Sequence, residues 1–312
     1  MPLRLQLTVP SEEQMTIRPR IIFDTTVINR FADEREAAEP LIAGLNSGYA
    51  VRVTATNVEE SVATPDSEKR HQLLEVCRQL IKGEGGEIIR PFHWIIEELI
   101  EQFERTGRAD WQNTRLRLPD YEREVVLREI INDEWSARER EHTANAKAQF
   151  ARVFTDAQPH FEEIFKAGKE SRPASVAELV ARLQVQGGAF WGFGEGFYER
   201  VAKRKPEESM IRRFVAECPP FQALLMAICV VQYDRSIREP DGKKPSSDRN
   251  DLLMAVYLPY CDEFVSDDRG QQTWLREVVS LCNLPTRVRW HREFRDSFSL
   301  KCAGPKKQIY AL

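Results

Sequence analysis

The stretch Arg249–Gln271, "RNDLLMAVYLPYCDEFVSDDRGQ", carries the strongest fold signal in this chain of 312 residues. Its segment "DLLMAVYLPY" has apolar residues all round, which predicts a buried helix beginning at Asp251. The apolar run "EFVS" then predicts a buried strand, and two adjacent aspartates, Asp267 and Asp268, follow it. Like charges at the end of a buried strand repel each other, so this turn requires a cation, a helix N-terminus or water as a compensating partner.

A second apolar run, near the N-terminus, has the same form. The segment "RIIFDTTVINRF" (Arg20–Phe31) predicts a buried strand that ends at Asp24 and continues into a helix. A further strand is expected at Ala50–Thr56, with a helix beginning at Asn57. Strands that alternate with helices in this way predict a parallel sheet of the α/β class.

Further helices and strands are expected around these runs. Asp66 or Ser67 caps a helix that stops before "KGEGGE", and the run "IIRPF" then predicts another strand. Either Asp248 or Asn250 caps the helix of the stretch quoted first. The remaining expected elements are a helix at Pro40–Leu45, an amphipathic helix at Gln272–Leu284 and a last strand at Thr286–Trp290.

The middle of the chain, residues 92–238, has long charged segments at helical spacing and few strand signals. It predicts an all-helical insertion between residues 18–91 and 239–312, which together supply one sheet and a basic tail. Within it, "GGAFWGFGEGFYER" (Gly187–Arg200) is interpreted as a packed turn between helices with buried aromatics. The phosphate-loop interpretation of this segment is weak because no GK[ST] follows the glycines.

Composition excludes several classes of function. The net charge is −4, so the molecule has no overall positive field to attract nucleic acid. Any such binding uses local patches. The six cysteines lack the spacing of zinc sites, and most are expected to be buried free thiols in a reducing cytoplasm. The N-terminus lacks the apolar core of a signal peptide, and no window reaches the length of a membrane span.

Carboxylates fall at equivalent points of the expected elements, at the ends of strands or the starts of the adjoining helices: Asp24, Glu60, Asp251 and Asp268. In a parallel sheet these points share one edge, where functional crevices form. Taken singly, each acid could cap a helix or meet its dipole. Taken together they predict an oxygen-ligand site for Mg²⁺ or Mn²⁺ rather than zinc, and metal-activated water makes phosphodiester hydrolysis the natural chemistry.

These residues resemble the motifs of PIN-domain nucleases. "IIFDTTVINRF" is similar to their first motif, in which a strand ends in Asp followed by Thr, and "NVEESVA" resembles their second acidic motif. The stretch Arg249–Gln271 is close to their C-terminal block, and "LPTRVRWHREF" resembles their last strand and turn. The resemblance covers roughly residues 18–90 and 246–296, and the helical middle has no counterpart.

The resemblance implies a PIN-like parallel sheet flanked by helices and a metal-dependent endoribonuclease. It implies that Asp24, Glu60, Asp251 and Asp268 bind Mg²⁺ or Mn²⁺. Thr25 and Ser266 would support these acids by hydrogen bonding. The family includes the toxins of toxin–antitoxin pairs and RNA-processing enzymes, so the resemblance admits a toxin, defence or processing role, an inhibitory protein partner and a homodimer.

Two positions leave a choice between neighbouring acids. Glu60 is preferred to Glu59 because Val58 then falls two residues before the acid, where the family's motif carries an apolar residue.

The first motif departs from the family at one position, since Thr26 stands where the family usually has Asn or Ser.

The second choice lies in the aspartate pair. The spacing Ser266-x-Asp268 favours Asp268 as the ligand. Asp267 would then face solvent or an adjacent basic group such as Arg269, in a supporting position.

Phosphate groups of RNA need lysines and arginines near the acids. The loop "GKKPSSDR" leads directly into Asp251, and Arg269 follows the aspartate pair. The expected nucleic-acid contacts are therefore Lys243, Lys244, Arg249 and Arg269, and an ordinary solvated loop is the equally weighted alternative for "GKKPSSDR".

Two other functions compete with the nuclease. A haloacid-dehalogenase-like phosphatase also begins with a strand that ends in Asp, but it usually needs a second Asp at the place of Thr26. A non-catalytic PIN-like scaffold would bind protein or RNA without cleaving it, and its binding would survive the substitution Asp24→Asn.

Overall fold

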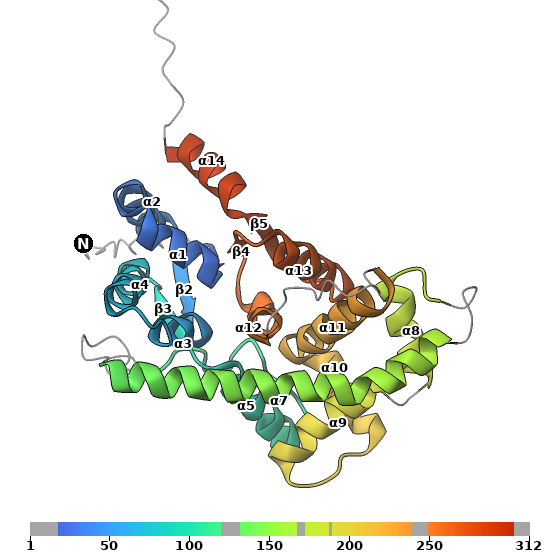
Figure 1. Ribbon diagram of the computed structural model, residues 1–312. Coiled ribbons are helices and arrows are strands. Elements are labelled where there is room, and N and C mark those ends of the chain that lie inside the picture. The colour runs from blue at the N-terminus through green and yellow to red at the C-terminus, as the bar shows by residue number, and fades with distance from the viewer. Residues whose placement is uncertain (1–17, 120–131, 167–171, 187–188, 239–248, 303–312) are drawn as a thin grey trace, which may run out of the picture.

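The computed structural model describes residues 18–119, 132–166, 172–186, 189–238 and 249–302. Its centre is a five-stranded sheet in the order β3-β2-β1-β4-β5, in which all neighbouring strands are parallel (Figure 1). The strands are β1 (Arg20–Phe23), β2 (Ala50–Thr54), β3 (Glu87–Ile89), β4 (Glu263–Ser266) and β5 (Arg287–Trp290). The predicted α/β class and the parallel sheet drawn from both ends of the chain are confirmed.

The central strand β1 fixes which loops meet. Ile22 pairs with Arg52 of β2 on one side and with Phe264 of β4 on the other. The amide of Asp24 then donates to the carbonyl of Val265 at 2.9 Å, which extends the ladder one residue beyond the strand. The carboxyl ends of β1 and β4 therefore lie side by side.

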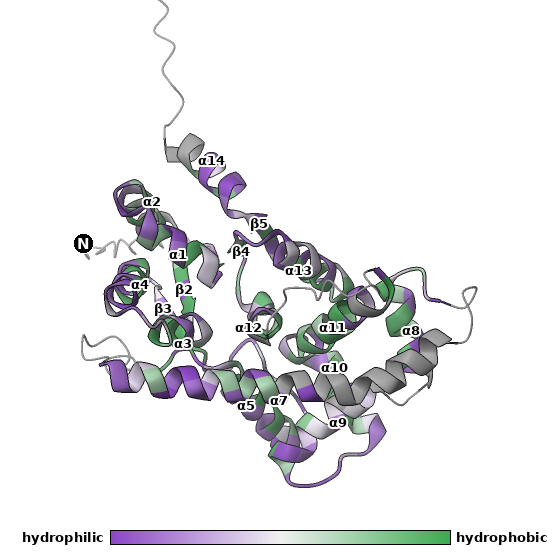
Figure 2. Cartoon of the chain, in the orientation of Figure 1, coloured by the Kyte–Doolittle hydropathy of each residue, from purple (hydrophilic) through white to green (hydrophobic). Residues whose placement is uncertain are grey.

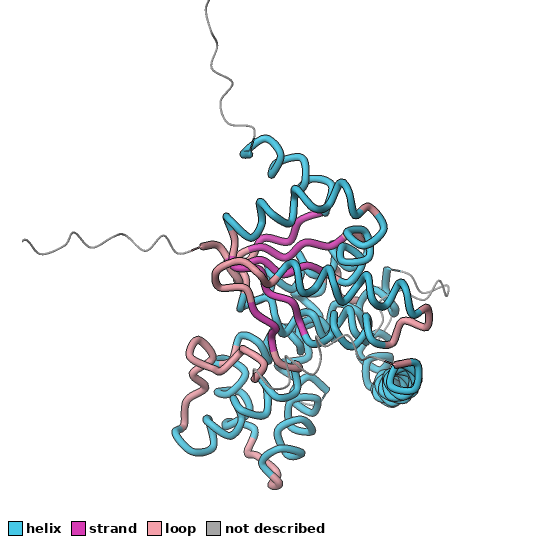
Figure 3. The backbone as a smooth tube through the Cα atoms, turned by 90° about the vertical axis from the view of Figure 1, so that its left-hand side faces the viewer, coloured by secondary structure: helices cyan, strands magenta, loops and turns pink. Residues whose placement is uncertain are grey.

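Helices cover both faces of the sheet because successive residues of a strand point to opposite faces (Figure 3). Ile21 and Phe23 belong to one hydrophobic cluster, and Ile22 belongs to the other. The first cluster includes residues of α1 (Thr25–Asp33), α2 (Arg35–Gly48), α4 (Ser67–Leu80) and α14 (His291–Cys302). The second includes residues of α5 (Phe92–Thr106), α11 (Pro219–Tyr233) and α13 (Arg269–Leu281).

The described part of the middle segment contains helices and, apart from an isolated bridge between Arg117 and Ile89, no strand pairing, as expected. Its helices, besides α5 and α11, are α7 (Asp133–Lys166), α8 (Val176–Gln186), α9 (Ala189–Ala202), α10 (Glu208–Glu217) and the π-helix η2 (Asp234–Arg238). Hydrophobic residues dominate α11, whereas the coloured part of α7 is largely hydrophilic (Figure 2). Because α11 shares a hydrophobic cluster with the sheet, the middle segment supplies much of the cover of one face. The division at residues 92 and 238 stays a prediction.

Two predictions, one of a helix boundary and one of a turn, are wrong for local reasons. Helix α3 (Ala55–Val62) begins before Asn57, because Thr54 and Asn57 form a reciprocal capping box that ends β2 at Thr54. The glycine-rich segment expected to be a turn lies in helix α9 where it is described. A Cβ at Gly194 would stand 3.2 Å from the Ile211 side chain, so this glycine permits close helix packing.

The C-terminal block also departs from the expectation. Its buried helix is α12 (Arg249–Leu253) followed by the 3₁₀ helix η3 (Met254–Tyr260), which contains Pro259. Asn250 lies inside α12 and is therefore not its cap, while Asp248 lies outside the described residues. Helix α13 begins at Arg269, earlier than Gln272, because Asp268 caps it.

Burial agrees with the expected state of the thiols: Cys77, Cys218, Cys229 and Cys261 are buried and free.

Within the described ranges, no single helix has the length and apolar character that crossing a membrane requires, although the bent pair α10 and α11 meets that test on length and composition alone.

Candidate functional site: carboxylates around Gln271

Asp24 lies at the carboxyl end of β1 and caps α1. The residue is 4% exposed, and its Oδ2 accepts hydrogen bonds from Thr26, at 3.2 Å from the amide and 2.5 Å from the hydroxyl. The Ser266 hydroxyl at the end of β4 lies 3.5 Å from the same oxygen. Asp24 therefore caps a helix, as expected for this acid taken singly. It is also a fixed carboxylate, so the capping role does not exclude a functional one.

Gln271 links Asp24 to an acid from another element. Its Nε2 donates to Oδ1 of Asp24 at 3.3 Å and to Oδ1 of Asp251 at 3.2 Å. Its backbone amide donates to Oδ1 of Asp268 at 2.9 Å, which is the capping bond of α13. Three aspartates thus converge on one residue, which is itself 2% exposed.

Glu60, on α3, joins the cluster through two polar neighbours. Asn250 of α12 donates to its Oε1 at 2.8 Å, and the Thr25 hydroxyl also bonds it. Thr25 is oriented in turn by Asn57, whose Nδ2 donates to the Thr25 hydroxyl at 3.0 Å. These contacts place Glu60 beside residues of the first and third motifs.

Burial raises the pKa of Glu60, and the charge of Asp24 raises it further. The hydrogen bonds from Thr25 and Asn250 and the positive charge of Lys147 act in the opposite direction. The fold therefore keeps carboxylates close together although their charges repel, a pattern found at functional sites and around cations.

Helix α7 brings Lys147 to this edge of the sheet. The helix packs against α3 and α12 and runs beneath them in Figure 1. Its N-terminal part is held by Ser136, which donates to the carbonyl of Thr64 at 3.2 Å, and by Asp133, which pairs with Arg70 at 2.6 Å. The helical middle therefore forms part of the site's surroundings.

The adjacent aspartates have different partners. Asp268 caps α13, while Asp267 forms an ion pair with Arg30 of α1 and accepts from the Trp290 indole at 3.1 Å. Arg269 lies over the Trp290 ring, 4.6 Å from its centroid, and is exposed. Asp267 thus faces a basic group, which is one of the two expectations, and that group is Arg30 rather than Arg269.

The structure brings together Asp24, Asp251 and Asp268 around one residue, with Glu60 adjoining and Thr25 and Ser266 as hydrogen-bond partners. The predicted residues Lys243, Lys244 and Asp248 lie outside the described residues, and Arg249 belongs to α12 without a described side chain. The sequence reasoning missed the polar residues that join the acids: Thr26, Asn57, Lys147, Asn250 and Gln271.

One of the missed residues had a local signal. Asp268-x-x-Gln271 has the spacing of a capping box, which marks a glutamine in the first turn of a helix. The pattern says nothing of the contacts that the Gln271 side chain makes with Asp24 and Asp251, because those residues are distant in the sequence.

The donor set can be compared with what a metal needs. Among the described residues, no three His, Cys, Asp or Glu side chains are grouped closely enough to form a complete ligand set. Mg²⁺ is commonly held by one or two carboxylates, with water and substrate phosphates completing its shell. Asp24 and Asp251, which share one amide, fit that mode with their oxygen ligands and do not fit a closed zinc site.

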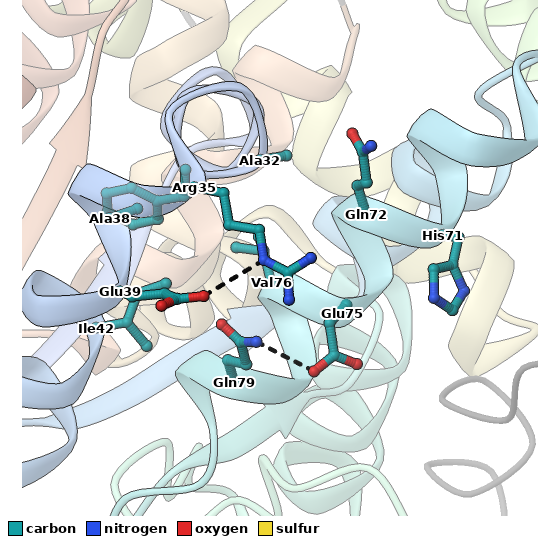
Figure 4. Close-up of a pocket in the computed structure, with 11 residues that line it drawn as sticks. Ala32, Arg35, Ala38, Glu39, Ile42, His71, Gln72, Glu75, Val76 and Gln79 are labelled. Carbon is teal, nitrogen blue, oxygen red and sulfur yellow. Dashed lines mark hydrogen bonds and ion pairs between the residues drawn. The ribbon is translucent and has the colours of Figure 1, made fainter.

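A pocket of about 190 Å³ opens between α1, α2 and α4, apart from these carboxylates (Figure 4). Its wall mixes apolar residues, such as Phe31 and Ile42, with polar and charged ones, among them the ion pair Arg35–Glu39. None of the four predicted acids lines it, so it contributes no group to a metal site built from them.

The motifs carry the whole of the family resemblance. Comparisons with protein-family models, with curated proteins and with solved structures gave no match.

Proposed function

We propose that this chain is a metal-dependent nuclease of the PIN type that hydrolyses phosphodiester bonds of RNA. The observation that carries the proposal is the convergence of Asp24 and Asp251, from opposite ends of the chain, on the single amide of Gln271. Glu60, whose pKa is raised by burial and by the charge of Asp24, stands beside them. Such a concentration of negative charge at a sheet edge is the expected setting for a divalent cation.

Asp24 and Asp251 would hold Mg²⁺ or Mn²⁺, which supplies an activated water and neutralises phosphate charge. Thr26 and Ser266 orient Asp24 through the hydrogen bonds described above. Glu60 is placed to accept the proton of the attacking water, because a carboxyl with a raised pKa is a stronger base near neutral pH.

The substrate would approach past two described cations, Lys147 of α7 and Arg269 at the start of α13. Arg269, which is exposed, stacks on the half-buried Trp290 next to Asp268, and such a cation–aromatic pair suits single-stranded RNA. Lys243, Lys244 and Arg249 remain further proposed phosphate contacts. The helical middle would then shape substrate choice through α7.

The test is cleavage of labelled single-stranded RNA and DNA by the wild type and Asp24→Asn, with Mn²⁺, with Mg²⁺ and with EDTA. The matched control is Asp296→Asn, an exposed aspartate on α14. We expect metal-dependent cleavage of RNA that Asp24→Asn loses and Asp296→Asn keeps, with both variants folded. Cleavage by Asp24→Asn at the wild-type rate, or in EDTA, would contradict the proposal.

Asp268 already serves as a helix cap, and this favours a second candidate function, that of a non-catalytic RNA-binding scaffold. A folded wild type that cuts nothing, and binds RNA as tightly as Asp24→Asn does, would support the scaffold instead.

A further inference from the structure

We propose that Gln271 is a ligand of the divalent cation, through its side-chain carbonyl oxygen Oε1. This inference rests on the proposed metal site of Asp24 and Asp251 and deepens it. Neither the acidic motifs nor the resemblance assigns a role to this glutamine.

The first observation is an unsatisfied oxygen. Gln271 is 2% exposed, and its Oε1 is buried without a hydrogen-bond partner among the described residues. A buried polar atom in this state costs about 1–3 kcal/mol, so it needs an explanation. The hydrogen bonds of the described residues therefore use only the donor end of this amide.

The second observation is what the other end of the amide does. Nε2 donates to Asp24 and Asp251 at once, so two carboxylates share one neutral donor. This donor reduces the repulsion between the two anions in the absence of metal. A cation bound by the same two oxygen atoms would also reduce the repulsion between the carboxylates, and it would repel the N–H groups of the amide.

A half-turn of the terminal amide resolves that conflict. The last torsion of a glutamine is broad and two-fold, so the turn exchanges nitrogen and oxygen without moving the rest of the side chain. The oxygen would then face the cation, and carbonyl oxygens suit Mg²⁺ and Mn²⁺. The backbone stays in place, because the amide of Gln271 remains bonded to Asp268.

Gln271 would therefore act differently in the two states. Without metal, it holds Asp24 and Asp251 together by donating to both. With metal, it adds an uncharged oxygen to a set that has too few clustered carboxylates among the described residues to complete a site alone.

The experiment measures Mn²⁺ affinity by calorimetry on the full chain, after removal of metal and in the absence of RNA. It compares the wild type with Gln271→Leu and Gln271→Glu. Gln272→Leu is the matched control, because Gln272 is a buried glutamine of the same helix that has no bond to Asp24 or Asp251 in the structure. We expect Gln271→Leu to weaken Mn²⁺ binding about tenfold or more, and Gln272→Leu to leave it unchanged.

Gln271→Glu keeps the shape of the side chain and replaces the amide by a carboxylate, so we expect tighter Mn²⁺ binding than in the wild type. This variant decides the matter if Gln271→Leu does not fold. Equal or tighter binding by a folded Gln271→Leu would show that Gln271 only competes with the cation and would overturn the inference. Weaker or unchanged binding by Gln271→Glu would overturn it as well. A wild type that binds no Mn²⁺ refutes the proposed metal site itself, and is thereby distinguished from a failure of Gln271 alone.

Discussion

Asp267 forms an ion pair with Arg30, while its neighbour Asp268 accepts a hydrogen bond from the backbone amide of Gln271. The two adjacent carboxylates therefore meet different compensating groups, a guanidinium from α1 and the N-terminus of α13. This arrangement explains how like charges can stand together at the end of a buried strand. It also separates their roles, since only Asp268 contacts the residue that joins Asp24 to Asp251.

The first prediction concerns Asp267→Asn. The substitution weakens the pair with Arg30, which is half exposed, so we expect a loss of about 1 kcal/mol in the free energy of unfolding. Cleavage should continue at close to the wild-type rate, because the Asp267 carboxylate binds Arg30 and the Trp290 indole. Urea unfolding and the RNA cleavage assay measure the two effects, and a variant that folds but no longer cuts would show that Asp267 belongs to the site.

The second prediction concerns Asp268→Asn. Asparagine caps helices about as well as aspartate does, so the unfolding free energy should change by less than about 0.5 kcal/mol. If the charge of Asp268 assists the metal, cleavage should fall by about tenfold or more. The same assays apply, and unchanged cleavage would leave Asp268 with the capping role alone.

The sequence predicted the strands well because buried parallel strands are short apolar runs with polar ends. The runs that end at Asp24 and Ser266 became β1 and β4, and their carboxyl ends meet as expected. Element boundaries were less accurate where a side chain decides them, as the capping pair Thr54 and Asn57 does at the end of β2.

The connections between the acids could not be predicted, because they depend on packing between distant segments. Gln271 and Asn250 contact acids of the first and second motifs only after α12 and α13 are placed on the sheet. Lys147 belongs to a segment that no motif covers, and only the position of α7 brings it near Glu60.

The third prediction concerns Lys147→Gln in the Asp24→Asn background, where RNA is bound and not cut. If Lys147 neutralises one phosphate, the substitution should weaken RNA binding. The negative slope of log K against log salt concentration should also become less steep by about 0.7. Fluorescence anisotropy at several salt concentrations measures the slope. The control is Arg138→Gln, an exposed arginine on the same helix, which should leave the slope unchanged. An unaltered slope for Lys147→Gln would place the phosphates elsewhere.

The fourth prediction concerns the stability of the metal-free protein as a function of pH. Burial, followed by the charge of Asp24, raises the pKa of Glu60 above its ordinary value of 4.5. Between the ordinary and the raised value, the unfolded chain has lost this proton while the folded chain still binds it. Stability is therefore lost as the pH rises through that window, and it stays lower above it.

Glu60→Gln removes this dependence while an amide oxygen remains to accept from Asn250. We therefore expect the variant to equal the wild type near pH 4 and to have a larger free energy of unfolding at pH 8, both in EDTA. Urea unfolding from pH 4 to 8 measures the difference, with Glu101→Gln as an exposed control on α5. A variant that is less stable than the wild type at pH 8 would mean that the ionised Glu60 is favoured by its neighbours, and that the negative cluster is already balanced by groups of the protein.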